Sequence, residues 1–217
     1  MRAAVREIFP EFSQKFEGRV LWPYLDIEGY VTVGIGCLIH PIALALALPW
    51  KLAGSGARAT LLEVTAQWEY LKNSTELARA GAQAAQHATT LRLNDADVDA
   101  LLFARMALNE AVLAKTFAGW SEYSADAQLG IHSMAWAMGA DFAKGYPHFK
   151  RAAEAGSWDE AADECTIGGE SKNAGLIPRN VANRICFHNA ARALENPKAL
   201  PPDQVSWPLE LVKEARP

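Results

Sequence analysis

The sequence predicts an α+β protein that is mostly helical and carries one small β-hairpin sheet near its N-terminus. Two observations predict this class. Several long segments space their apolar residues at helical intervals with little Gly or Pro, and residues 30–35 alternate directly after a turn. The chain has 217 residues, half of them hydrophobic, including seven Trp and eight Phe. That composition supports a packed core and excludes low-complexity disorder.

The first predicted element is a short helix that ends at Glu17. Pro10 suits the first helical position, where its missing N–H costs nothing. Phe9, Phe12 and Phe16 give the helix one apolar stripe, and Gly18 is a typical C-terminal stop.

A β-hairpin follows this helix. Residues 20–25 are typical of a strand, residues 26–29 (Asp-Ile-Glu-Gly) of a turn, and residues 30–35 of a second strand. The alternation places Tyr30, Thr32 and Gly34 on one face and the β-branched residues on the other.

The remaining chain is predicted to be helical except at its end. Residues 41–60 are ambiguous, because prolines and glycines interrupt an apolar segment. The predicted helices cover 61–87, a segment starting at Asn94, a segment starting at Ser124 with a fully apolar run at 129–138, a segment starting at Ser157, and 178–194. Residues 195–217 form a Pro-rich tail, which we expect to be extended or loosely ordered.

Charge and hydropathy exclude several classes of protein. The net charge of −4 argues against a dedicated nucleic-acid binder, which needs a basic surface. The most apolar run, residues 42–48, is far shorter than the roughly 20 residues of a membrane span, so we expect no stable membrane insertion. The N-terminus lacks the apolar core of a secretory signal, so we expect synthesis in the cytoplasm.

Cysteine and histidine usage predicts neither a metal site nor a cofactor. Cys37, Cys165 and Cys186 are too few for a disulfide framework, although a single Cys165–Cys186 bridge stays open. The spacing of Cys165, Cys186 and His188 fits a zinc site poorly. His132 lies in an apolar helix, and we expect it to be a core histidine with satisfied hydrogen bonds.

Three polar residues near the N-terminus suit glycosidic bond cleavage. Glu17 ends the first helix, Asp26 lies in the turn, and Thr32 lies on the second strand. Folding the hairpin toward the helix end would bring the three together. Apolar neighbours would keep Glu17 protonated as a general acid, whereas Asp26 in a polar turn would stay ionised.

The string around these residues resembles the catalytic segment of phage-type lysozymes, glycoside hydrolase family 24. That family has a Glu, an Asp and a Thr at the separations of Glu17, Asp26 and Thr32, followed by Gly-x-Gly, here residues 34–36. Residues 133–139 are similar to its central helix, 157–162 to the next helix start, and 175–180 to the start of its closing helix.

The resemblance implies a peptidoglycan muramidase that hydrolyses the bond between N-acetylmuramic acid and N-acetylglucosamine with inversion. Glu17 would donate the proton, Asp26 would stabilise positive charge or orient water, and Thr32 would hold the attacking water. The implied fold has two lobes, is monomeric, and needs no cofactor. One catalytic domain would cover 1–194, with an N-terminal lobe (8–60), connecting helices (61–110) and a helical lobe (111–194), before the tail 195–217.

The resemblance also suggests substrate contacts at Leu38, Trp136 and Phe149, and a cation near Glu17 at Arg179. Core packing is the alternative for Leu38, Trp136 and Phe149, and capping or pairing on the surface is the alternative for Arg179. The chain departs from the family at Cys37, where a His is common. It departs again at Ala137, where an Asn or Gln is common.

Two other functions share this architecture. A lytic transglycosylase typically uses one carboxylate, so Asp26 and Thr32 favour hydrolysis. A non-catalytic peptidoglycan-binding module would not need Glu17. The setting stays open between a phage endolysin and an antibacterial effector of a contractile (type VI) secretion system, the latter with a secretion or immunity protein as partner. In either case we expect it to act on peptidoglycan in the periplasm or cell wall.

Overall fold

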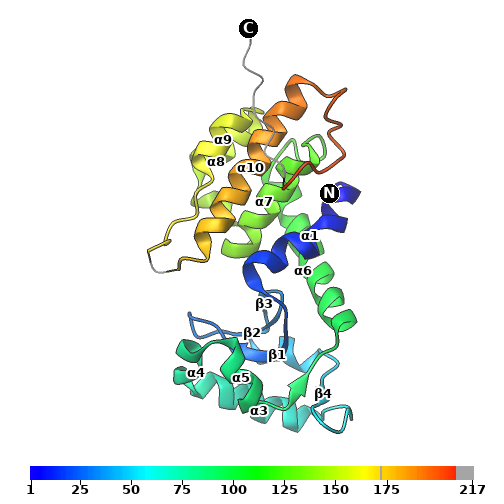
Figure 1. Ribbon diagram of the computed structural model, residues 1–217, viewed down its shortest axis with the longest axis vertical. Helices are drawn as coiled ribbons and strands as arrows, with labels where there is room; N and C mark the ends of the chain where they lie inside the picture. Colours follow the sequence, from blue (N-terminus) through cyan, green and yellow to red (C-terminus); the bar gives the residue numbers. More distant parts are fainter. Residues whose placement is uncertain (172, 209–217) are drawn as a thin grey trace. The chain divides into compact units, whose positions relative to one another are not determined.

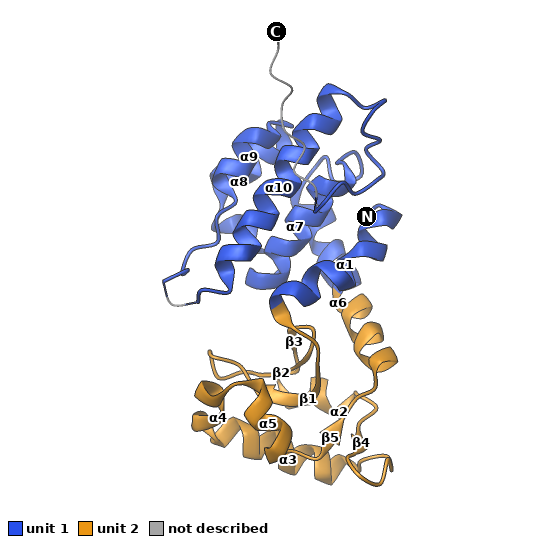
Figure 2. Cartoon of the chain, in the orientation of Figure 1, with its two compact units in different colours: residues 1–16, 106–217 blue, residues 17–105 orange. Residues whose placement is uncertain are grey.

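The computed structural model describes residues 1–171 and 173–208, and it shows a mostly helical chain with a small antiparallel sheet (Figure 1). The predicted α+β class is therefore confirmed. The chain divides into two units (Figure 2). Unit 1 comprises residues 1–16 and 106–217, and unit 2 comprises residues 17–105.

A three-stranded antiparallel sheet is the centre of unit 2. Its strands are β1 (Val20–Leu25), β2 (Val31–Gly34) and β3 (Cys37–Leu38), in that spatial order. The β1–β2 hairpin and its turn lie where the sequence predicts them. All four residues of β2 are buried, with Val31 and Val33 fully enclosed. A second, two-stranded sheet pairs β4 (Lys51–Leu52) with β5 (Leu91–Arg92).

Helices pack against the larger sheet. α3 (Leu61–Asn73), α4 (Thr75–Ala80) and α5 (Ala82–Ala88) all contact β1, and the short α2 (Ile42–Leu46) packs on α3. The sequence predicts one helical stretch over 61–87, but the structure breaks it twice. The Ser74 hydroxyl donates to the Tyr70 carbonyl at the first break, and Gly81 takes a positive φ of 80° at the second.

The first helix, α1 (Ala3–Glu17), ends at the predicted residue but begins earlier than predicted. Pro10 is an interior residue instead of an N-terminal one. The additional turns are held by Val5 and Phe9, which are fully buried in unit 1. Burial of these side chains therefore outweighs the backbone hydrogen bond that Pro10 cannot donate.

α6 (Asp95–Thr116) begins at the predicted Asn94 cap, where the Asp97 N–H donates to Asn94 Oδ1 at 2.8 Å. The Arg19 guanidinium pairs with Asp95 at 2.7 Å and with Asp99 at 2.6 Å. These ion pairs tie the chain that follows Glu17 to the first turns of α6 within unit 2.

Unit 1 is a helical assembly around α7 (Ala125–Met138), which is buried on all sides from residue 125 to 136, as its apolar run predicts. α10 (Leu176–Glu195) packs on α7 and on α9 (Trp158–Glu164), and α8 (Pro147–Glu154) packs on α9. A short 3-10 helix, η1 (Phe142–Lys144), precedes α8. The helix starts predicted at Ser124 and Ser157 are confirmed, and α10 begins two residues before Pro178.

The segment after α10 is better fixed than the sequence predicts. The N–H groups of Ser206 and Trp207 donate to the Asp126 carboxylate at 2.8 and 3.0 Å. The Trp207 side chain is buried against Phe12, with ring centroids 4.7 Å apart. Residues 201–208 are thus anchored on unit 1, while the predicted tail residues 209–217 lie outside the described residues.

The division into units differs from the boundaries expected from sequence. The structure groups residues 61–105 with the sheet in unit 2, where α3, α4 and α5 contact β1. None of the described helices is long and apolar enough to cross a membrane.

Candidate active site

The Glu17 carboxyl group lies against the β2–β3 turn. Gly18, in the left-handed conformation with φ 70°, ends α1 and directs the chain into β1. A Cβ atom built on Gly36 would stand only 2.6 Å from Glu17 Oε2. Gly36 also has a positive φ of 65°. Glycine is therefore required at position 36 both for backbone conformation and for close approach of the carboxyl group.

Asp26 is held rigidly by its own turn. Its Oδ1 accepts hydrogen bonds from the N–H groups of Glu28 at 3.0 Å and Tyr30 at 2.8 Å. The Asp26 N–H donates to the Tyr30 carbonyl at 2.9 Å, which closes the hairpin. The turn predicted at 26–29 therefore orients the carboxylate through Oδ1, and neither of these two N–H groups binds Oδ2.

Thr32 joins this arrangement from β2. Its hydroxyl donates to Asp26 Oδ2 at 3.3 Å, and the side chain is only 4% exposed. In the sheet Thr32 pairs with Tyr24 of β1 and with Leu38 of β3. Directly paired residues present their side chains on the same face, so Tyr24, Thr32 and Leu38 form one row across the sheet.

The sequence did not identify Tyr24 as a site residue, yet the charges of both Glu17 and Asp26 act on its phenol. Burial raises the pKa of its phenol well above the ordinary value, and the negative charges of Glu17 and Asp26 raise it further. Tyr24 is therefore a neutral hydroxyl beside the candidate acid and its partner. The strand register relative to Thr32 is the only signal that could have identified it.

Cys37 stands where the resembling family commonly has a histidine. Burial raises the pKa of its thiol to about 12, against the opposing effect of Arg105. The negative charge of Glu17 raises it further. Cys37 is consequently a neutral thiol at physiological pH, and it supplies no positive charge to the site.

The other three predicted contact residues belong to unit 1. Trp136 is 8% exposed and packs edge-on against Phe9. Phe149 is 1% exposed within the core beside Phe117 and Phe187, so it has no ring face open to a sugar, and its position is that of a packing residue.

Arg179 is buried on α10. Its Nη1 donates to the Ser133 carbonyl at 3.2 Å, and its guanidinium lies over the Phe16 ring at 4.9 Å. Phe16 is the residue before Glu17 in the chain. Surface pairing, the alternative reading of Arg179, is wrong, because the side chain is only 2% exposed. The cation near Glu17 stays a prediction.

Histidine and cysteine outside the site show no metal chemistry. His132 is fully buried as predicted, but neither ring nitrogen has a hydrogen-bond partner among the described residues, so the expectation of satisfied hydrogen bonds is wrong. All three cysteines are free. Among the described residues, no three His, Cys, Asp or Glu side chains gather closely enough to hold a metal ion.

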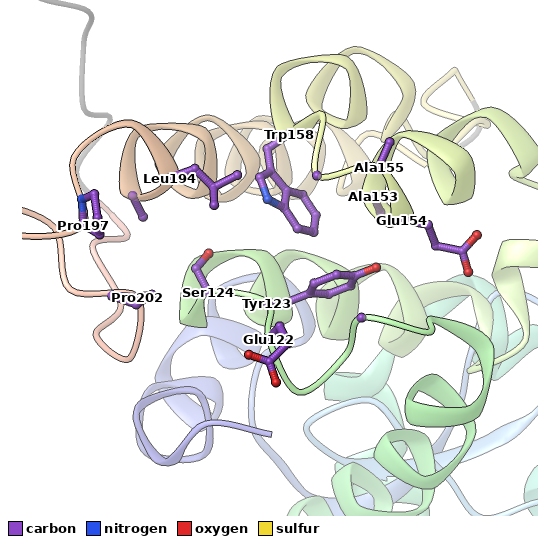
Figure 3. A pocket seen from close by; sticks show the side chains of 13 residues that line it. Glu122, Tyr123, Ser124, Ala153, Glu154, Ala155, Trp158, Leu194, Pro197 and Pro202 are labelled. Atoms are coloured by element: carbon purple, nitrogen blue, oxygen red, sulfur yellow. The ribbon is translucent and has the colours of Figure 1, made fainter.

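Unit 1 also contains a pocket of about 450 Å³ that the sequence did not indicate. Its walls are mainly apolar, and the Tyr123 and Trp158 rings lie in its lining in edge-to-face contact, with centroids 4.9 Å apart (Figure 3). Two carboxylates, Glu122 and Glu154, complete the lining. Glu154 pairs with Lys150 at 2.6 Å, and Glu122 Oε1 accepts a hydrogen bond from the Ser121 hydroxyl at 3.2 Å.

Comparison of the chain with models of known protein families and with curated proteins finds no match. Its function is therefore inferred from its own residues, of which Glu17, Asp26 and Thr32 all belong to unit 2.

Proposed function

We propose that this chain is a peptidoglycan muramidase that cleaves the β-1,4 bond between N-acetylmuramic acid and N-acetylglucosamine. The observation that carries the proposal is that the Glu17 and Asp26 carboxyl groups lie beside one small sheet, where both act on Tyr24. Glu17 lies against Gly36 at one end of the β2–β3 turn, and Asp26 is fixed by its own turn and bonded to Thr32.

The two carboxyl groups have different surroundings, which suits different roles. Asp26 accepts two backbone N–H bonds and the Thr32 hydroxyl, an arrangement that stabilises and orients a carboxylate. It would stabilise the positive charge that develops on the sugar ring. Glu17, whose carboxyl group lies against Gly36 at the β2–β3 turn, would deliver the proton to the leaving oxygen.

Thr32 would position the attacking water. Its hydroxyl donates to Asp26 Oδ2, so the oxygen lone pairs remain available to accept a hydrogen bond from water. A water bridged by Thr32 and Asp26 would attack the anomeric carbon from the face opposite Glu17. This route inverts the configuration, and NMR of the first-formed sugar anomer distinguishes it from direct attack by Asp26.

A lytic transglycosylase is the second candidate. Such an enzyme forms an anhydro-muramic product without water, so it has no need of a carboxylate–threonine pair. The Asp26–Thr32 hydrogen bond favours the hydrolase.

Mass spectrometry of digested, purified peptidoglycan tests the proposal. A hydrolase releases fragments with reducing muramic acid ends. Anhydro-muramic ends would instead identify a transglycosylase, and the absence of fragments at high enzyme concentration would identify a binding module.

A further inference from the structure

Three aromatic rings and one lysine gather beside the Asp26 turn within unit 2. We name Tyr30, His40, Trp68 and Lys72 the aromatic cluster. The Tyr30 and His40 rings meet edge-on with centroids 5.3 Å apart, and the His40 and Trp68 rings stack at 5.3 Å with an angle of 19°. Tyr30 is 44% exposed, although a phenol of this size is normally more enclosed when it only fills a core.

The sheet register connects the cluster to the candidate active site. Thr32 pairs with Leu38, and continuing this antiparallel pairing places Tyr30 opposite His40. On the other side, the Tyr30 carbonyl accepts from the Asp26 N–H, and the Tyr30 N–H donates to Asp26 Oδ1. Tyr30 is thus the link between the Asp26 carboxylate and the His40 ring.

Helix α3 fixes the outer members of the cluster. The Trp68 indole N–H donates to the Ile39 carbonyl at 3.0 Å, which holds the ring against the strand that carries His40. This hydrogen bond gives the indole N–H a partner and fixes the orientation of the ring. A platform whose rings are already ordered loses little side-chain entropy when it binds a ligand.

Lys72 adds a positive charge at the same place. Its ammonium group donates to the Gly29 carbonyl at 2.6 Å and lies 5.4 Å from the Tyr30 ring centroid. It forms no ion pair with any carboxylate in the part of the chain that the structure describes. In a chain of net charge −4, a half-buried lysine without an acidic partner at the site is a distinct feature.

His40 contributes a further polar atom. Its Nδ1 is buried and has no hydrogen-bond partner among residues 1–171 and 173–208. A buried polar atom of this kind is costly unless a ligand or solvent molecule reaches it. The cluster therefore offers ring surface and an ammonium group, and it also encloses a buried nitrogen that has no partner among the described residues.

We propose that the aromatic cluster is a binding subsite for a pyranose ring that carries a carboxylate, as N-acetylmuramic acid and its peptide do. The sugar ring would pack its C–H face on the aromatic surface, and the carboxylate would pair with Lys72. This assignment rests on the proposed muramidase function, because it places one sugar of the glycan next to Asp26.

Binding of two soluble glycans to the full chain tests the subsite. The catalytically disabled Glu17→Gln variant prevents cleavage during titration calorimetry. One ligand is a neutral N-acetylglucosamine tetramer, and the other is a tetramer in which muramic acid alternates with N-acetylglucosamine. We expect Lys72→Met to weaken the muramic tetramer about five-fold and to leave the neutral tetramer unchanged.

Trp68→Ala tests the ring surface, and Tyr70→Ala is its matched control. Tyr70 is an aromatic residue on the same helix, 49% exposed, and outside the cluster. We expect Trp68→Ala to weaken both tetramers about ten-fold, and Tyr70→Ala to change neither. Thermal melting identifies any variant that is unfolded, and Lys72→Met keeps the test decisive because its side chain is not part of the core.

The possible results separate the subsite from the proposed function. The subsite is overturned if Lys72→Met and Trp68→Ala, each folded and each combined with Glu17→Gln, bind both tetramers as tightly as Glu17→Gln alone. That conclusion holds even when the unmutated chain cleaves peptidoglycan. The subsite is also overturned if Lys72→Met weakens both tetramers equally. If the parent binds as expected but never cleaves peptidoglycan, the subsite stands and the muramidase proposal fails.

Discussion

Thr32, a buried polar side chain in the sheet of unit 2, has a hydrogen-bond partner, whereas His132 and Ser133 of helix α7 in unit 1 are buried without one among the described residues. Thr32 is 4% exposed, and its hydroxyl donates to Asp26. His132 and Ser133 are fully buried on α7, yet the His132 ring nitrogens and the Ser133 hydroxyl have no partner among the described residues. Thr32 is thus held in a fixed position, whereas His132 and Ser133 carry an uncompensated desolvation cost.

This difference indicates where chemistry resides. A catalytic group needs a fixed orientation, which requires hydrogen bonds from a rigid backbone. The Asp26 turn and the Gly36 turn supply that rigidity in unit 2. In α7 the polar groups are packed among apolar neighbours, so their replacement should affect stability and not the chemical step.

The largest effect is expected from Gly36→Ala. The added Cβ would collide with the Glu17 carboxyl group, and position 36 has a positive φ. We expect hydrolysis to fall at least about 100-fold, because displacing the acid removes general acid catalysis. Initial rates on purified peptidoglycan measure the loss.

Gly56→Ala is the matched control for this prediction. Gly56 has nearly the same φ, 67°, but nothing lies within 4 Å of its Cβ position. Gly56→Ala should lose only the stability that backbone strain costs, about 1–3 kcal/mol, and should keep its specific activity. Equal loss of activity in the two variants would show that strain, not the position of Glu17, is responsible.

An intermediate effect is expected from Thr32→Val. The substitution keeps the shape and removes the hydroxyl that contacts Asp26 at 3.3 Å. We expect kcat to fall roughly ten-fold with little change in KM, since a positioned water acts mainly in the transition state. Thr32→Ser restores the hydroxyl and should recover most of the activity. A rise in KM with kcat unchanged would contradict this role.

The smallest effect on activity is expected from His132→Leu, which should change acid stability instead. Burial lowers the pKa of His132 to about 4, whereas an unfolded histidine titrates near 6.5. The unfolded state therefore binds the proton first, so stability is full above pH 6.5 and is lost as the pH falls toward 4. Between pH 7 and pH 5 this amounts to about 2 kcal/mol.

Urea unfolding at both pH values measures the His132 contribution. The Leu variant should lack that part of the pH dependence and should be as stable as the parent, or more so, at pH 7, because an unpartnered polar group is removed. A loss of several kcal/mol at pH 7 would show that the His132 nitrogens do have partners.

Local patterns predicted much of the fold. The end of α1 at Glu17, the hairpin, and the caps at Asn94 and Ser124 follow from short-range chemistry. Helix α9 also begins after Ser157 as predicted, although the Ser157 side chain makes no capping hydrogen bond. The helix start predicted at Pro10 is wrong, because packing against residues from distant segments keeps α1 helical on both sides of this proline. The third strand is only two residues long, too short for any alternation to show.

The candidate site was predicted in part for the same reason. Glu17, Asp26 and Thr32 lie within sixteen residues of one another, so a local motif identifies them. Tyr24 emerges only from strand register, and the contact of Trp68 with His40 depends on α3 packing across the sheet. The burial of Phe149 likewise depends on rings from other segments, those of Phe117, Phe142 and Phe187.

The most direct test of the account is the activity of Glu17→Gln on purified peptidoglycan. The amide has the same shape as the acid but no proton to donate, so we expect a loss of about 10²–10⁴-fold in the release of reducing muramic ends, with unchanged melting. Glu28→Gln, at an exposed carboxylate in the Asp26 turn, should behave like the parent. Retention of more than about a tenth of the parent activity in Glu17→Gln would contradict the assignment of Glu17 as the acid.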